Sequence, residues 1–232
     1  MPTTDAPTRR ERLRAELVAQ VKDVALEHLR ADGPQGLSLR AVARDVGVSP
    51  GALYRYFDGR DALLTALISD GYDDLADHLT VALDRATEGP RARMHAVCGA
   101  YRDWGVAHPN QFALLFGTPA QDYAAPADGP TVVAYRRVAA ALLDPVLGAL
   151  DAGTTPGARA ATRDAFHADL EGLADRRLPD GTVPFVLGIW GWLHGLACLE
   201  VFGHLDWAYP EGLGATFTAA VEARMDELGL PD

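Results

Sequence analysis

The stretch that decides the fold spans residues 38–64 and has the sequence SLRAVARDVGVSPGALYRYFDGRDALL. Its first third carries apolar residues at helical spacing, and Gly47 follows them, as expected for a residue that ends a helix in the left-handed conformation. A serine and a proline then supply the cap and first residue of a second helix, residues 51–57, with Leu53 and Phe57 on its buried side. Two short helices joined by a tight turn predict a helix-turn-helix, a motif that places its second helix in the major groove of DNA.

This stretch and the helix before it resemble the DNA-binding domain of the TetR family of one-component regulators. The resemblance covers about residues 15–65 and rests on Val21, Val24, Ala25, Leu29, Gly33, Ala43, Gly47-Val48-Ser49, Leu53-Tyr54-Arg55-Tyr56-Phe57 and Arg60-Asp61-Ala62-Leu63-Leu64. Two positions depart from it, because Ala52 stands where a threonine is common and Arg60 where a lysine is common.

The resemblance implies which residues contact DNA. Phosphate or backbone contacts are expected from Ser38, Arg40, Ser49, Tyr54, Tyr56 and Arg60. Base contacts are expected from Gly51, Ala52 and Arg55. An arginine can bind guanine through two hydrogen bonds, whereas an alanine can only touch a thymine methyl group.

Charge is divided unevenly along the 232 residues, whose net charge is −11. Residues 1–60 hold ten basic and eight acidic residues, a balance of +2, and residues 61–232 hold eleven and twenty-four, a balance of −13. Phosphates respond to the local field, because charges more than about 10 Å away are screened at cellular salt. The basic run Arg9, Arg10, Arg12 and Arg14 therefore matters more for DNA than the net charge does.

The rest of the chain predicts an all-α protein with two domains, a DNA-binding domain over residues 9–60 and an effector-binding and dimerisation domain over residues 61–232. A long helix over residues 61–86 belongs to both halves, and further helices are expected over about residues 91–107, 131–150 and 158–178. Residues 117–129 are rich in Pro, Ala, Asp and Gly, and form either a gate to a pocket or an ordinary surface loop.

The segment 183–204 is apolar almost all round and carries Gly188, Gly191 and Gly195 along one strip. Such a helix cannot lie on the surface of a monomer, so with a final helix over residues 210–228 it predicts a four-helix interface in a homodimer. This region also resembles the Trp-His-Gly class of TetR-type C-terminal domains, through Trp190, His194-Gly195-Leu196, Leu199-Glu200, Tyr101, His108-Pro109, Phe112 and Leu115-Phe116.

Together these features predict a cytoplasmic regulator, a repressor by the family's usual behaviour, that binds a near-palindromic operator in double-stranded DNA. A small apolar or aromatic effector would release it. The candidate pocket residues, each of which could equally be ordinary core, are Tyr101, Trp104, Phe112, Phe116, Tyr135, Trp190 and His194. An activator or a ligand-independent regulator of the same fold is the alternative.

Other classes of function have little support in the sequence. An enzyme would need His194 with Glu200 or His204 with Asp206, and neither pair has a nucleophile at suitable spacing. We expect no cofactor and no metal, since the acidic positions along residues 70–78 fit a solvated helix face. Cys98 and Cys198 fit buried apolar positions in a reducing compartment, and no apolar run approaches the length that a membrane requires.

Overall fold

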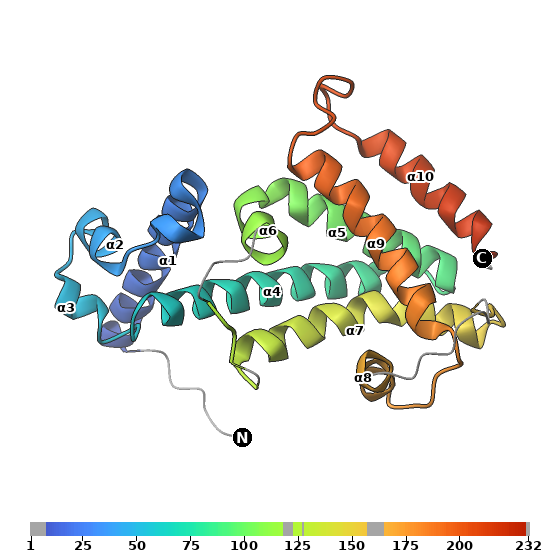
Figure 1. Ribbon diagram of the computed structural model, residues 1–232, viewed down its shortest axis with the longest axis horizontal. Helices are drawn as coiled ribbons and strands as arrows, with labels where there is room; N and C mark the ends of the chain where they lie inside the picture. Colours follow the sequence, from blue (N-terminus) through green and yellow to red (C-terminus); the bar gives the residue numbers. More distant parts are fainter. Residues whose placement is uncertain (1–7, 118–122, 127, 157–164, 231–232) are drawn as a thin grey trace. The chain divides into compact units, whose positions relative to one another are not determined.

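The computed structural model describes residues 8–117, 123–126, 128–156 and 165–230, and within these ranges it is all-α, as the sequence predicts (Figure 1). The described helices are α1 (Arg9–Gly36), α2 (Leu39–Val46), α3 (Pro50–Leu53), α4 (Arg60–Arg85), α5 (Pro90–Ala107), α6 (Pro109–Phe116), α7 (Pro130–Asp151), α8 (Ala165–Ala174), α9 (Thr182–Val201) and α10 (Gly214–Glu227).

The chain forms two compact units. The first comprises Met1–Asp70 and Asn110–Thr131, and the second comprises Gly71–Pro109 and Val132–Asp232. The units therefore divide inside α4, after Asp70, and not between residues 60 and 61. Helix α4 contributes residues to both.

The first unit has its core between α1, α2, α3 and the start of α4. Its fully buried members include Ala25, Val42, Leu53 and Leu63. Tyr123, from the predicted gate segment 117–129, packs against this core, and its Oη lies 3.0 Å from Thr65 Oγ1. A gate role for this segment stays a prediction, and residues 118–122 and 127 lie outside the described residues.

Helix α3 is shorter than the predicted 51–57, because the backbone tightens after Leu53. The Tyr56 N–H donates to Leu53 O at 2.8 Å, a three-residue spacing, and the Arg55 N–H donates to Ala52 O at 3.3 Å. Gly59 then turns the chain with φ +94°. Phe57 is still buried, so the predicted core position is kept although the α-helix has ended.

In the second unit α9 packs against α5 and α8, and α10 packs against α5 (Figure 1). Helix α9 has a mean hydropathy of 1.5 over 18 residues, with 28% of that window buried, and is long and apolar enough to cross a membrane. The expectation that no run approaches that length was therefore wrong, although a helix in a protein core or interface meets the same criterion.

Helices α9 and α10 are shorter than predicted, α8 ends before the predicted residue 178, and a residue with positive φ lies at an end of each. Asp175, with φ 50°, follows α8, and part of the predicted helix 158–178 lies outside the described residues. Gly203, with φ 69°, lies just beyond the end of α9. Gly212, with φ 86°, precedes α10 and delays its start to Gly214.

Candidate functional site

The turn between α2 and α3 is built by two local devices. Gly47 is left-handed at φ 81°, and the N–H groups of Gly47 and Val48 donate back to the carbonyls of Arg44 and Ala43 at 3.1 and 2.9 Å. Ser49 Oγ then accepts from the Ala52 N–H at 3.3 Å and caps α3. These bonds fix the direction in which α3 leaves the turn.

Most of the predicted DNA-contacting residues are solvent-exposed in this unit. Ser38, Arg40, Ser49, Gly51, Tyr54 and Arg55 are exposed, and Ala52 is half-buried. Tyr54 has 51% of its surface exposed although it is a large aromatic residue. The Ser38 side chain makes no capping bond, which leaves its hydroxyl available to a ligand.

Tyr56 and Arg60 have intramolecular partners. Tyr56 packs partly against the core, and the Arg14 guanidinium lies 5.3 Å from its ring centroid. Arg60 Nη1 lies 3.4 Å from Asp61 Oδ1. The cation–π contact brings the start of α1 beside residues 51–57, which we call the recognition segment, and the motif alone did not indicate this neighbour.

Arginine pairing differs between the two units. In the second unit eight arginines lie within 4.0 Å of a carboxylate: Arg91, Arg93, Arg102, Arg136, Arg137, Arg176, Arg177 and Arg224. In the first unit seven have no ion-pair partner among the described residues: Arg9, Arg10, Arg12, Arg14, Arg30, Arg40 and Arg55. Among the described arginines of the second unit this holds for Arg85 alone, so the unpaired arginines concentrate in the unit that carries the helix-turn-helix.

The second unit contains a cavity of about 380 Å³ between side chains of α5, α7, α8 and α9. Its wall is mainly aliphatic, with Leu142, Val146 and Leu170 contributed by α7 and α8, and α8 adds the aromatic Phe166. Nothing in the sequence distinguished these residues from core, since both show the same apolar helical spacing. A volume of this size is at the lower end of the range for small-molecule sites.

Two of the seven predicted pocket residues, Tyr135 and Trp190, line this cavity. Tyr101 and His194 lie behind Trp190, with ring centroids 5.4 and 5.2 Å from it, and the His194 ring is stacked. Trp104 is buried elsewhere, and its Nε1–H donates to Asp74 at 2.7 Å. Phe112 and Phe116 belong to the first unit and contact each other at 5.0 Å.

His194 is placed to be neutral. Its Nδ1 lies 2.9 Å from Tyr101 Oη and its Nε2 lies 3.3 Å from Cys198 Sγ, which suits an imidazole with one donor and one acceptor. Burial lowers the pKa of His194 and raises the pKa of both Tyr101 and Cys198. The other thiol, Cys98, is buried in the cavity wall, and its pKa is raised to about 12. Neither thiol is therefore activated as a nucleophile.

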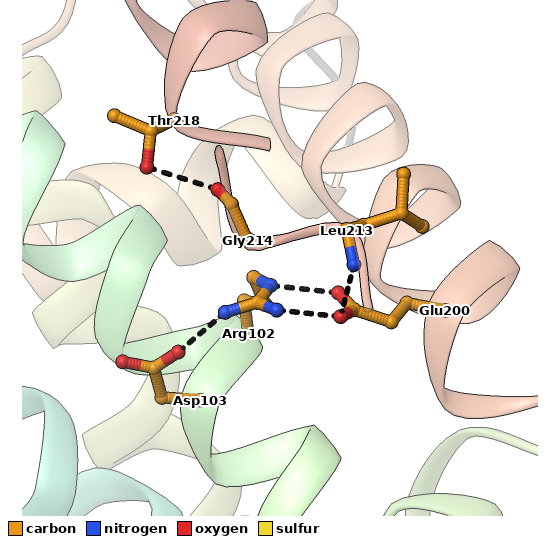
Figure 2. Close-up of polar contacts among 6 residues, drawn as sticks. All are labelled: Arg102, Asp103, Glu200, Leu213, Gly214 and Thr218. Carbon is orange, nitrogen blue, oxygen red and sulfur yellow. Dashed lines mark hydrogen bonds and ion pairs between the residues drawn. The ribbon is translucent and has the colours of Figure 1, made fainter. Parts of the chain in front are cut away.

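Glu200, one of the two acidic partners considered for an enzyme, binds Arg102 and the Leu213 N–H and makes no hydrogen bond to His194. Figure 2 shows its carboxylate between the Arg102 guanidinium and the Leu213 backbone N–H. Arg102 Nε donates at 2.6 Å and Leu213 N at 2.9 Å. The Arg102 guanidinium also lies 5.6 Å from the centroid of the Phe217 ring. This cluster ties the start of α10 to α5 and α9.

The acidic face of α4 is paired within the protein. Asp73 and Asp77 bind Arg137, and Asp70 binds Lys22. Over the described part of the chain, no group of three or more His, Cys, Asp or Glu side chains could hold a metal ion.

Comparison with known proteins agrees with this arrangement. Residues 22–67 match the family model described as bacterial regulatory proteins of the tetR family, and residues 94–223 match the model described as tetracyclin repressor-like, C-terminal domain. Neither description names the Trp-His-Gly class, which stays a prediction.

Individual proteins are similar over nearly the whole chain. The HTH-type transcriptional regulator Rv1816 of Mycobacterium tuberculosis is 35% identical over 207 residues, which cover 84% of this chain and 85% of that protein. The crystal structure of regulatory protein SCO4313 has 34% identity and a TM-score of 0.70, and covers 95% of this chain and 98% of its own. A protein with unknown function from Rhodococcus sp. RHA1 has 28% identity and a TM-score of 0.66, with full coverage of both chains.

Proposed function

Because the chain belongs to the TetR family of bacterial transcriptional regulators, we propose that it is a repressor controlled by a small molecule. In this proposal a homodimer binds a near-palindromic operator in the cytoplasm, and an apolar or aromatic effector in the cavity of the second unit releases it. The observation that supports it most directly is that one chain combines an exposed recognition segment with an apolar cavity of ligand size.

A dimer follows from the small number of base-reading side chains. One helix-turn-helix presents three or four of them, and each good pairing discriminates by about 1–3 kcal/mol. Two copies on half-sites about 34 Å apart, or a multiple of that, double the discrimination.

Helix α9 offers the surface for pairing. Leu187 and Leu199 on α9 and Phe202 directly after it have 48%, 37% and 40% of their surfaces in solvent. A Cβ added at Gly191 or Gly195 would meet nothing within 4 Å in this chain, so internal packing does not require these glycines. Each glycine costs a helix about 1 kcal/mol relative to alanine. A second α9 that packs closely against these glycines would explain why the helix carries them, since a side chain there would hold the two helices apart.

The route from cavity to DNA runs through α4 in this proposal. Tyr135, in the cavity wall, contacts Tyr72 of α4 edge to face, with ring centroids 5.6 Å apart. A ligand that moves Tyr135 would bias α4, and with it the spacing of the two recognition segments. A hundredfold loss of operator affinity requires the ligand to prefer the released state by about 2.7 kcal/mol.

The test begins with an operator selected from a random duplex pool by the purified protein. We expect a palindromic site, a dimer in analytical ultracentrifugation, and weaker operator binding when a cavity ligand is added. Tyr72→Leu should keep the affinity for both DNA and ligand but reduce the effect of one on the other. A ligand that binds without changing operator affinity in the wild type would favour a ligand-independent regulator, and one that tightens DNA binding would favour an activator or a corepressor-type response.

A further inference from the structure

The mouth of the cavity is chemically distinct from its interior. Of the side chains that line it, four are exposed, and two of those are charged: Tyr135, Arg136, Asp169 and Leu187. Arg136 has 59% of its side chain in solvent and Asp169 has 65%, whereas the interior is formed by buried and half-buried, mainly aliphatic residues. A molecule that fills the cavity would thus have its apolar part inside and its polar part beside these two charges.

The pair at the mouth is weakly held. Arg136 Nη2 lies 3.5 Å from Asp169 Oδ1, whereas the part-buried Arg102–Glu200 pair has an N···O distance of 2.6 Å. Exposed ion pairs contribute only about 0–1 kcal/mol, so a competing group can separate Arg136 from Asp169 at little cost. Asp169 would return to water, where most of its side chain already lies.

Hydrogen-bond donors outnumber acceptors among the groups that line the cavity. The Arg136 guanidinium has five N–H donors and no acceptor, and the Tyr135 hydroxyl can donate as well as accept. Among the described lining residues Asp169 is the one carboxylate. A ligand that presents acceptors is therefore favoured over one that presents donors, and guanidinium groups bind carboxylates with matching two-pronged geometry.

We propose that the cavity binds a monocarboxylic acid with an apolar body, and this proposal rests on the proposed function. The carboxylate of the ligand takes the place of Asp169 in the ion pair with Arg136. The apolar body occupies the interior between α5, α7, α8 and α9. The volume of about 380 Å³ restricts this body to a small or medium-sized group.

Three probes with the same alkyl chain test the class of head group: decanoate, decan-1-ol and decylamine, titrated into the full-length protein by calorimetry. We expect decanoate to bind at least about tenfold more tightly than either of the others, equivalent to about 1.4 kcal/mol. Arg136→Met should abolish this preference, and Asp169→Asn should preserve or increase it. The matched control is Arg137→Met, since Arg137 is next in sequence but binds Asp73 and Asp77 and does not line the cavity.

Three results would overturn the proposal: equal or tighter binding of the alcohol or the amine, a preference for decanoate that survives Arg136→Met, or no binding by any probe. Because Arg136 is exposed, the variant should fold, and unchanged thermal unfolding checks this. Operator binding separates the two proposals. Decanoate that binds through Arg136 without affecting DNA would refute ligand-controlled release and keep the ligand class, whereas release by a non-acidic cavity ligand alone would do the reverse.

Discussion

Glu200 accepts hydrogen bonds from two parts of the chain at once, from Arg102 on α5 and from the Leu213 N–H ahead of α10 (Figure 2). Its side chain is 9% exposed and that of Arg102 is 16% exposed. Removing one partner of a buried ion pair costs about 3–5 kcal/mol, because the other charge is left uncompensated. We expect Arg102→Ala to lower the free energy of unfolding in urea by about 3 kcal/mol. Arg176→Ala, which breaks an exposed pair, should cost less than about 1 kcal/mol.

The pKa of Glu200 also predicts how the stability of the protein depends on pH. Burial raises the pKa of Glu200, but the hydrogen bonds from Arg102 and Leu213 outweigh it and hold the pKa below its ordinary value of 4.5. A carboxyl with a depressed pKa adds stability above its unfolded pKa, and that stability is lost as pH falls through the folded value. The wild type should therefore lose stability below about pH 4.5, and Arg102→Ala should lose less. Urea titrations at about pH 6 and pH 4 give the free energy of unfolding of both proteins. If the wild type and Arg102→Ala lose the same free energy between these pH values, the acid sensitivity belongs to groups other than Glu200.

Arg55 and Arg40 are both exposed, yet substituting each should weaken DNA binding in a different way. Arg55 belongs to the recognition segment, so we expect Arg55→Ala to cost about 1–3 kcal/mol and to relax the preference at one base pair of each half-site. Arg40, on α2, should contact a phosphate, so Arg40→Ala should weaken binding to all sequences alike. Titrations of the selected operator and its single-base variants would separate these outcomes, and an unchanged base preference in Arg55→Ala would exclude base contact.

At the scale of the helix, we expect Gly195 of α9 to permit close packing against a second α9. A side chain at Gly195 meets no atom within 4 Å in the chain itself, so Gly195→Leu should leave the protomer folded while it blocks close approach of a second α9. We expect a shift from dimer to monomer in sedimentation and a loss of operator binding. Gly172→Leu is the matched control, because Gly172 is exposed on α8 and a Cβ added there also meets nothing within 4 Å. A dimer that survives Gly195→Leu would place the interface elsewhere.

Helices whose ends depend on local signals were predictable. The expected limits of α4, α5 and α7 lie within one residue of those observed, since Pro and Gly stops and caps act over a single turn. Helices α3 and α10 were predicted too long, because periodicity does not reveal where the backbone tightens after Leu53 or turns at Gly212. The cavity was beyond sequence reasoning. Aromatic residues indicated Tyr135 and Trp190, but its aliphatic wall comes from four helices distant in sequence and looks like any core.

Across the whole molecule, arginines without an ion-pair partner are concentrated in the first unit, and this division determines how salt should affect DNA binding. Arg9, Arg10 and Arg12 have no ion-pair partner in the described structure, and Arg14 is drawn to Tyr56 of the recognition segment. Each phosphate that a cation neutralises adds about 0.9 to the slope of log affinity against log salt. Replacing Arg9, Arg10 and Arg12 with Gln should therefore reduce that slope by up to about 5 in a dimer, without changing base preference.

The matched change in the second unit is Arg177→Gln, which removes a cation that is 85% exposed and only 3.7 Å from Glu171. If net charge governed DNA binding, Arg177→Gln would lower the salt slope by as much as any one of the three N-terminal substitutions does. If the local field governs it, the slope of Arg177→Gln stays at the wild-type value, because Arg177 belongs to the second unit and is not among the residues expected to contact phosphates. If the local field governs DNA binding, a chain with a net negative charge can still bind DNA, through a short basic segment whose arginines have no ion-pair partner.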